Sequence, residues 1–326
     1  MWRRVHHLAI FAMFSILACS SSDDGGDGPT GPGEAQQEIQ AYVTTSSPAT
    51  DNVDDPLWDS VAVDTVPLRR SGAIIASIAA LPQEFELQAI RTSDKLFLRC
   101  RWADPQINVK ISPWRVITGD GTATLIRDES EFDFGEDQLL VMFDGAPDGG
   151  WDAWRWMAYR TGTVGLAEGL TYRDGSFIKD GGGSHVYHDN PLNSGRPLYL
   201  SEEGADFTGD TLYLSEATTD WSGHTTSGWS LGQTIPGYVI DSSTARQMKS
   251  DPESRWDIQA AWDYSNGHHT VVLSRELNTG FFAAQDLDMA GLDSVSVRIG
   301  MLDDLPDLIP NNSSQQAFTK ELILKL

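Results

Sequence analysis

Short segments in which apolar and polar residues alternate recur along most of this chain, separated by Gly, Asn, Asp and Pro. Strand side chains point alternately to the two faces of a sheet, so this pattern is typical of β-strands. Helical periodicity is weak, and only the tract 244–250 suggests a short helical turn. We therefore expect one large all-β domain. The clearest segments are 85–92, 95–102, 137–144, 153–160, 197–202, 211–216, 237–241, 256–264, 269–277 and 294–302.

The clearest hairpin joins 256–264 to 269–277 through Asn266-Gly267, a pair that tolerates the positive φ of a tight turn. On its first strand the alternation gives one apolar face, made of Trp256, Ile258, Ala260 and Trp262. On its second strand His269, Val271 and Leu273 share one face, and His268, Thr270 and Val272 share the other. Because both histidines flank the turn, we expect them to be solvated.

Residues 162–235 differ from the rest, because they are rich in Gly, Ser, Thr and Asp. We interpret them as long loops with short strands, an insertion that covers one end of the domain. His185 and His188 stand three apart in this stretch, in HVYH. On a helix that spacing could hold a metal ion, but the flanking glycines favour a surface loop.

Residues 151–160, WDAWRWMAYR, follow the apolar run EDQLLVMFDG. In a strand, one face would carry Asp152, Trp154, Trp156, Ala158 and Arg160. Two neighbouring indoles make a broad apolar wall, which suits a planar ligand such as haem or a stacked sugar ring, or simply packs a large core.

The N-terminus resembles a bacterial lipoprotein signal. Arg3 and Arg4 precede an apolar run too short to span a bilayer, which ends in Ile16-Leu17-Ala18-Cys19. We expect residues 1–18 to be a signal peptide, Cys19 to be lipidated, and 19–47 to be a flexible tether to a domain over 48–326. Because Ser20 rather than Asp follows Cys19, we expect an outer-membrane lipoprotein, facing the periplasm or the cell surface.

The chain is strongly acidic, with a formal net charge of −24 from 23 basic and 47 acidic residues. Removal of residues 1–18 would delete two arginines and leave 21 − 47 = −26. Such a surface argues against nucleic acid and anionic lipid as partners, so we expect membrane contact only through the lipid. It is compatible with a basic redox partner protein, with cation binding, or with solubility alone.

Cysteine use excludes two possibilities. With Cys19 lipidated, Cys100 has no partner for an intrachain disulfide. Cys100 shares one strand face with Leu98 and Trp102, which predicts a buried thiol. No CxxCH occurs, so covalent attachment of c-type haem is excluded.

Four segments together resemble the ethylbenzene dehydrogenase-related, DMSO reductase-like haem-binding domain, a family related to carbohydrate-binding and cytochrome-like sandwiches. They are DNVDDPLWDSV (51–61), ELQAIRTSDKLFLRCRWADP (86–105), EDQLLVMFDG with WDAWRWMAYRTG (136–162), and SNGHHTVVLSRELNTG (265–280). The resemblance implies an immunoglobulin-like antiparallel β-sandwich, here with long loop insertions, that holds haem b non-covalently. In the best-known members it is the electron-transfer subunit of periplasmic molybdenum enzymes, with iron held by Met and by Lys or His.

This chain departs from the family pattern where ligands are expected. The Met-Gly pair before the tryptophans is replaced by AlaProAspGlyGly (146–150), the late lysine is absent from LeuSerArgGlu (273–276), and His269 replaces the hairpin tryptophan. The remaining candidates for axial ligands are Met142, Met157, His268 and His269. Each residue also has an explanation that involves no haem. The two methionines would pack in the core, and the two histidines would be solvated residues beside a turn.

Other chemistry is weakly indicated. Asp144, Asp148 and Asp152 stand on a Gly-rich stretch that could hold calcium, although turn chemistry explains Asp-Gly equally well. No nucleophile elbow, P-loop or dinucleotide fingerprint occurs, so nothing demands catalysis.

Three hypotheses follow. The first is a lipid-anchored haem-binding β-sandwich that carries electrons outside the inner membrane. The second is a haem-free binding module on the cell surface that stacks Trp154, Trp156, Trp221 or Trp229 on sugar. The third is a scaffold lipoprotein of a surface complex.

Overall fold

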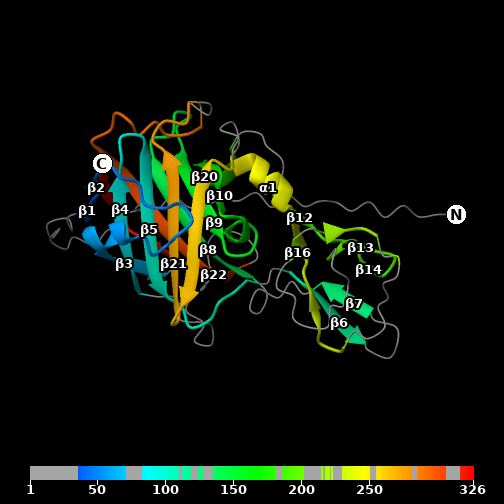
Figure 1. Cartoon of the computed structure of the whole chain (residues 1–326). Helices are drawn as coiled ribbons and strands as arrows, with labels where there is room; N and C mark the ends of the chain where they lie inside the picture. The colour runs from blue at the N-terminus through cyan, green and yellow to red at the C-terminus, as the bar shows by residue number, and fades with distance from the viewer. Residues whose placement is uncertain are drawn as a thin grey trace, which may run out of the picture.

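In the computed structural model, nearly all of the regular secondary structure among the described residues is β-strand, which confirms the all-β prediction (Figure 1). The residues that it describes are 36–70, 83–109, 112–118, 124–127, 135–180, 186–201, 214–215, 217–220, 222, 230–249, 255–280, 285–305 and 316–326. The predicted signal peptide, Cys19, His185, Trp221 and Trp229 lie outside these ranges. Within them, no helix has the length and apolarity needed to cross a membrane.

The main sheet closes on itself, which corrects the expected immunoglobulin-like β-sandwich. Ten of its strands form a ring in which every neighbouring pair is antiparallel, and the ring closes where Val297 of β22 lies opposite Phe143 of β8. The result is a ten-stranded barrel-like sheet with β4, β5, β21 and β20 in front and β8, β9 and β22 behind (Figure 1). In ring order the strands are β22 (Ser294–Leu305), β23 (Gln316–Thr319), β3 (Asp64–Arg70), β4 (Glu84–Arg91), β5 (Lys95–Ala103), β21 (His268–Glu276), β20 (Ile258–Ser265), β10 (Leu166–Arg173), β9 (Trp151–Met157) and β8 (Glu136–Asp144).

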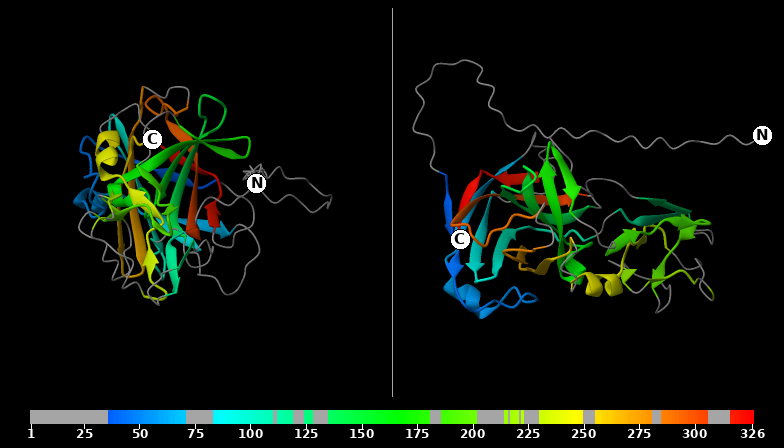
Figure 2. Two further views of the ribbon diagram at one scale, coloured as in Figure 1. Left: turned by 90° about the vertical axis from the view of Figure 1, so that its right-hand side faces the viewer. Right: turned by 90° about the horizontal axis from the view of Figure 1, so that it is seen from above.

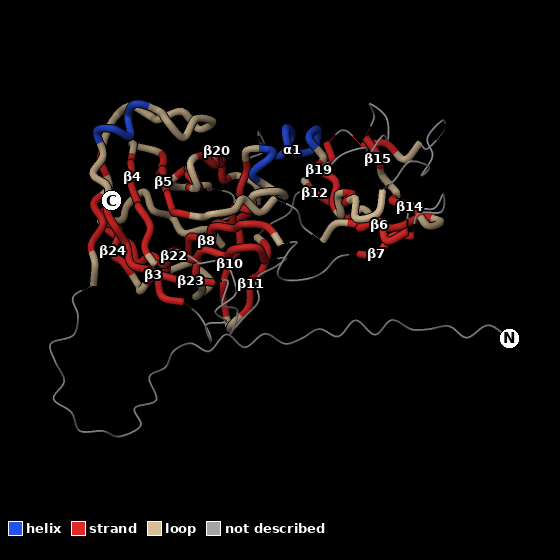
Figure 3. Tube along the Cα trace, turned by 90° about the horizontal axis from the view of Figure 1, so that it is seen from below, coloured by secondary structure: helices blue, strands red, loops and turns tan. Residues whose placement is uncertain are grey.

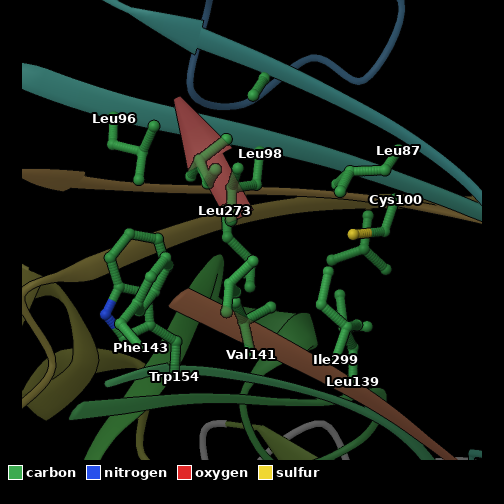
Figure 4. Close-up of a cluster of buried hydrophobic side chains, with 14 of the residues drawn as sticks. Leu87, Leu96, Leu98, Cys100, Leu139, Val141, Phe143, Trp154, Leu273 and Ile299 are labelled. Atoms are coloured by element: carbon green, nitrogen blue, oxygen red, sulfur yellow. The ribbon is translucent and has the colours of Figure 1, made fainter. Parts of the chain in front are cut away.

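The alternation seen in the sequence decides which side chains fill the interior. Leu96, Leu98 and Cys100 of β5, with Leu273 of the neighbouring strand β21, face Val141 of β8 across the core (Figure 4). All are fully buried, and Cys100 is the buried thiol that the sequence predicts. The core is therefore assembled from every second residue of strands far apart in sequence.

The predicted hairpin is present as β20 and β21. Asn266 and Gly267 adopt φ values of +52° and +71°, the positive values that a two-residue hairpin turn needs. This turn sets the register in which Tyr264 lies opposite His269 and Trp262 opposite Val271.

The folded domain begins earlier than residue 48. The strand β1 (Glu38–Gln40) pairs with the C-terminal strand β24 (Leu322–Lys325), and β2 (Tyr42–Val43) pairs with β4. Part of the predicted tether is thus bound to the sheet edge. The 3-10 helix η1 (Pro56–Ser60) follows, capped by the Asp55 side chain, and buries Trp58 against the outer face of the barrel.

A smaller lobe lies beside the barrel and contains the described residues of the Gly-rich stretch from 186 onward, together with residues 114–118 and 124–127 (Figures 1 and 2). The helix α1 (Ser242–Lys249), predicted as a short turn, lies between the two parts (Figure 3). The remaining elements are η2 (Gly162–Val164), β11 (Ser176–Lys179), β6 (Trp114–Thr118) with β7 (Thr124–Arg127) and β18 (Thr234–Ile235), β12 (Tyr187–Asp189) with β19 (Tyr238–Ile240) and β16 (Leu214–Ser215), β13 (Leu192–Asn193) with β14 (Arg196–Pro197), and β15 (Leu200–Ser201) with β17 (Ala217–Thr218).

Candidate functional site

Trp154 and Trp156 share the inner face of β9, as the alternation predicts, and both are fully buried. Trp154 packs on Phe143 with ring centroids 4.8 Å apart, and the Arg275 guanidinium lies 5.0 Å from its ring. Trp156 contacts Trp102 and Trp262, with centroids 6.3 and 5.5 Å away. Neighbouring side chains cover both indoles, so the wall packs the core and offers no open face to a sugar or haem ring.

Polar residues close the barrel interior at the end where β5 finishes and β21 begins. By the alternation of the adjoining strands, the side chains of Asp104, Asp137 and His269 all point into the barrel. All three are at most 5 % exposed. His269 Nε2 lies 2.9 Å from Asp137 Oδ2 and 3.7 Å from Asp104 Oδ2. The expectation that His269 is solvated is wrong, because the chain beyond β5 and the start of β8 cover this end.

The His269 ring is held by aromatic neighbours on both sides. Trp102 stacks on it with centroids 4.9 Å apart and planes at 23°, and Trp262 lies at 6.2 Å and 28°. Burial lowers the pKa of His269 to about 4, against the opposing effect of the Asp104 and Asp263 carboxylates. The imidazole is therefore neutral at neutral pH, the state in which it can act as a ligand.

A buried ion pair stands at the opposite end of the interior. Arg275 donates to both oxygens of Asp152, at 3.1 and 2.6 Å, and also lies 3.5 Å from Asp286. The predicted calcium site is therefore not formed, because Asp152 is committed to Arg275. Asp144 is exposed, and Asp148 binds Arg173 at 2.9 Å.

The four candidate haem ligands do not converge. Met142 and Met157 face outward from β8 and β9 and pack in two different apolar clusters. His268 faces outward, with Nδ1 3.0 Å from the Asn266 carbonyl oxygen, whereas His269 faces inward and binds Asp137. These four residues thus supply no pair of axial ligands, and they do not fit haem b.

Val186, Tyr187 and His188 of the HVYH segment are not helical, and His185 lies outside the described residues. His188 lies on the strand β12, where its ring contacts Tyr199 with centroids 5.0 Å apart.

Sequence reasoning missed Asp104, Asp137 and the role of Trp102. The alternation of strand side chains could have indicated both aspartates. Asp104 lies two residues beyond inward-facing Trp102, and Asp137 lies two residues before inward-facing Leu139. A polar residue that continues an apolar face marks a buried polar site.

The sequence matches the family model described as ethylbenzene dehydrogenase over residues 55–297, which covers most of the barrel and the smaller lobe. The chain belongs to this family. No curated protein matches it.

Two solved structures of carbohydrate binding module family 9 from Caldicellulosiruptor kristjanssonii are similar to this member of the family. The glucose complex is 8% identical with a TM-score of 0.35, covering 89% of this chain and 96% of the module. The cellotriose complex is 11% identical with a TM-score of 0.32, covering 88% and 93%. At these TM-scores the likeness carries no weight for the function of this chain.

Proposed function

We propose that this chain is a non-catalytic accessory subunit of an extracytoplasmic redox enzyme. Membership of the ethylbenzene dehydrogenase family over residues 55–297 is the observation that carries the proposal. The best-known members that the chain resembles are electron-transfer subunits of periplasmic molybdenum enzymes. The net charge of −24 suits a basic partner protein.

We also propose that Cys19 is lipidated and that the lipid alone attaches the mature protein to the outer membrane. The basic start, the short apolar run and Ser20 support this placement. Replacing Cys19 with Ser should move the exported protein from the membrane fraction to the soluble fraction. An unchanged distribution between the two fractions would contradict the lipid anchor.

Haem b is the cofactor that family membership implies, yet Met142, Met157, His268 and His269 do not fit it. We therefore favour a haem-free accessory role, in which the barrel is a packed scaffold and binding takes place on its surfaces. A haem-binding electron carrier is the second candidate, and the family match supports it. Sugar stacking on Trp154 and Trp156 is disfavoured by their burial.

An absorbance spectrum of the full chain carrying Cys19→Ser, exported with haem supplied, separates the two candidates. A protein that stays colourless through haem titration supports the haem-free role. A sharp Soret band with split α and β bands in the reduced form, at one haem per chain, overturns it in favour of the electron carrier. Affinity purification of the tagged chain tests the accessory role itself, which requires that a redox enzyme co-purify. Purification of the chain alone would contradict it.

A further inference from the structure

We propose that the acidic surface around η1 is the docking site for a basic face of the redox enzyme. This inference rests on the proposed accessory role, and it names the part of the chain that the enzyme would bind. The η1 surface consists of the exposed side chains of residues 42–43 and 51–63. It lies on the side of the barrel away from the smaller lobe (Figures 1 and 3).

Three exposed apolar side chains form the centre of the η1 surface. Val43, Val63 and Tyr42 are 64 %, 52 % and 41 % exposed. All three flank β4, because Tyr42 lies opposite Ile90 and Val63 directly precedes the residue that pairs with Leu87. Leu87 and Ile90 are about 10 Å apart along the strand, so the three apolar side chains are close enough to enter one interface.

The 3-10 helix is fixed against the barrel beside this apolar centre. The Gln88 side-chain amide donates hydrogen bonds to the carbonyl oxygens of Trp58 and Val61, at 3.0 and 2.9 Å. Trp58 is 3 % exposed and belongs to the same apolar cluster as Phe97 on the outer face of the sheet. Because hydrogen bonds and burial already fix this backbone, the surface needs little ordering when a partner binds.

Acidic side chains lie beside the apolar centre. Residues 36–64 contain six acidic residues and neither lysine nor arginine. Asp51, Asp54 and Asp59 are exposed. Arg99 lies 3.8 Å from Asp54 and interacts electrostatically with Asp59, but its side chain is only 19 % exposed. One guanidinium beside three aspartates leaves a local charge of 1 − 3 = −2.

Charge complementarity identifies the chemistry of the partner. An acidic face attracts a protein face that is rich in lysine and arginine, and it repels nucleic acid and anionic lipid. Apolar and aromatic side chains at the centre, with charged side chains around them, are the usual arrangement of a protein interface. The matching face of the enzyme is therefore basic at its rim and apolar at its centre.

Titration of the full chain carrying Cys19→Ser with the redox enzyme that co-purifies with it tests the η1 surface. We expect Asp59→Lys and Tyr42→Ala each to raise the Kd by about tenfold or more, because each removes a complementary group from the interface. Added salt should weaken binding of the chain that retains Asp59 more than binding of Asp59→Lys, because salt screens the attraction between exposed charges.

Two matched controls change similar groups outside the η1 surface. Asp144→Lys makes the same charge change at an exposed position at the end of β8, and Leu231→Ala shortens a side chain that is 73 % exposed in the smaller lobe. Both should bind like the chain without these substitutions, and near-UV circular dichroism checks that each variant folds. Carbodiimide cross-linking, which joins carboxylates to neighbouring lysines, needs no variant and should link Asp51, Asp54 or Asp59 to the enzyme.

Three outcomes overturn the docking site while the accessory role stands. The first is that folded Asp59→Lys and Tyr42→Ala bind the enzyme as tightly as the controls. The second is that Asp144→Lys weakens binding as much as Asp59→Lys, which would indicate attraction by net charge alone. The third is that cross-links form only at carboxylates outside residues 36–64. If no redox enzyme co-purifies with the chain, the accessory role fails and the docking site fails with it.

Discussion

Arg275 and Asp152 form a bidentate ion pair inside the barrel, with their side chains at most 1 % exposed. The backbone N–H of Leu287 also donates to Asp152 Oδ2, at 2.9 Å. Planar guanidinium and carboxylate groups match in this geometry, which makes each hydrogen bond stronger than a neutral one. The pair therefore joins β21 to β9 across the interior.

Replacing Arg275 with Met should destabilise the protein by about 3–5 kcal/mol, because Asp152 would stay buried without its cation. Chemical denaturation measures the loss. The matched control is Lys95→Met, which breaks the exposed pair with Glu276 at 3.0 Å and should cost at most about 1 kcal/mol. Similar losses in the two variants would show that burial does not set the strength of these pairs.

Gly162 is required where the chain passes over Trp156. A Cβ atom there would lie 2.8 Å from Trp156 Nε1 and 3.0 Å from Trp262 Nε1. Gly162→Ala should therefore cost about 1–3 kcal/mol through overpacking, seen as a lower denaturation midpoint. Gly291→Ala, where a Cβ atom meets nothing within 4 Å, is the control and should leave the midpoint nearly unchanged. If Gly162→Ala were as stable as that control, the packing over Trp156 would not be tight.

The sequence predicts local features of this fold well and its closure poorly. Alternation and Asn266-Gly267 were enough to predict the β20–β21 hairpin and the shared inner face of Trp154 and Trp156. The pairing of β22 with β8 joins segments about 150 residues apart, and alternation identifies strands without identifying their partners.

The candidate site shows the same limit. His269 is in phase with Val271 and Leu273, but its place beside a turn suggested solvation. Asp104, just beyond β5, and Asp137 of β8 lie beside it, and only the folded sheet brings these three residues together. His269 also stands where the family resemblance expects a tryptophan, so the polar cluster distinguishes this chain from the pattern it otherwise follows.

Asp180 should make stability depend on pH. Burial raises the pKa of Asp180 to about 7, against the hydrogen bond from Thr171, whereas the unfolded value is near 3.8. Between these values the folded state binds more protons than the unfolded state, so this residue favours folding below about pH 4 and its contribution is lost as pH rises through 7. The difference between the folded and unfolded pKa values corresponds to at most about 4 kcal/mol of unfolding free energy.

The substitution Asp180→Asn should remove that dependence. Denaturation at a series of pH values should show the variant gaining stability relative to the unsubstituted protein from pH 4 to pH 8. The control is Asp144→Asn, in an exposed carboxylate, measured over the same pH series. Parallel pH profiles for Asp180→Asn and the unsubstituted protein would contradict a raised pKa.

Cys100 should be unreactive in the folded protein. Its thiol is fully buried within the barrel core, and burial raises its pKa to about 12, so almost no thiolate forms at neutral pH. In the full chain carrying Cys19→Ser, Cys100 is the single thiol, and its reaction with a disulfide reagent should require unfolding. The reaction rate should rise with denaturant in step with the loss of near-UV circular dichroism. Rapid labelling under native conditions would show instead that the interior beside Leu98 and Val141 opens without unfolding.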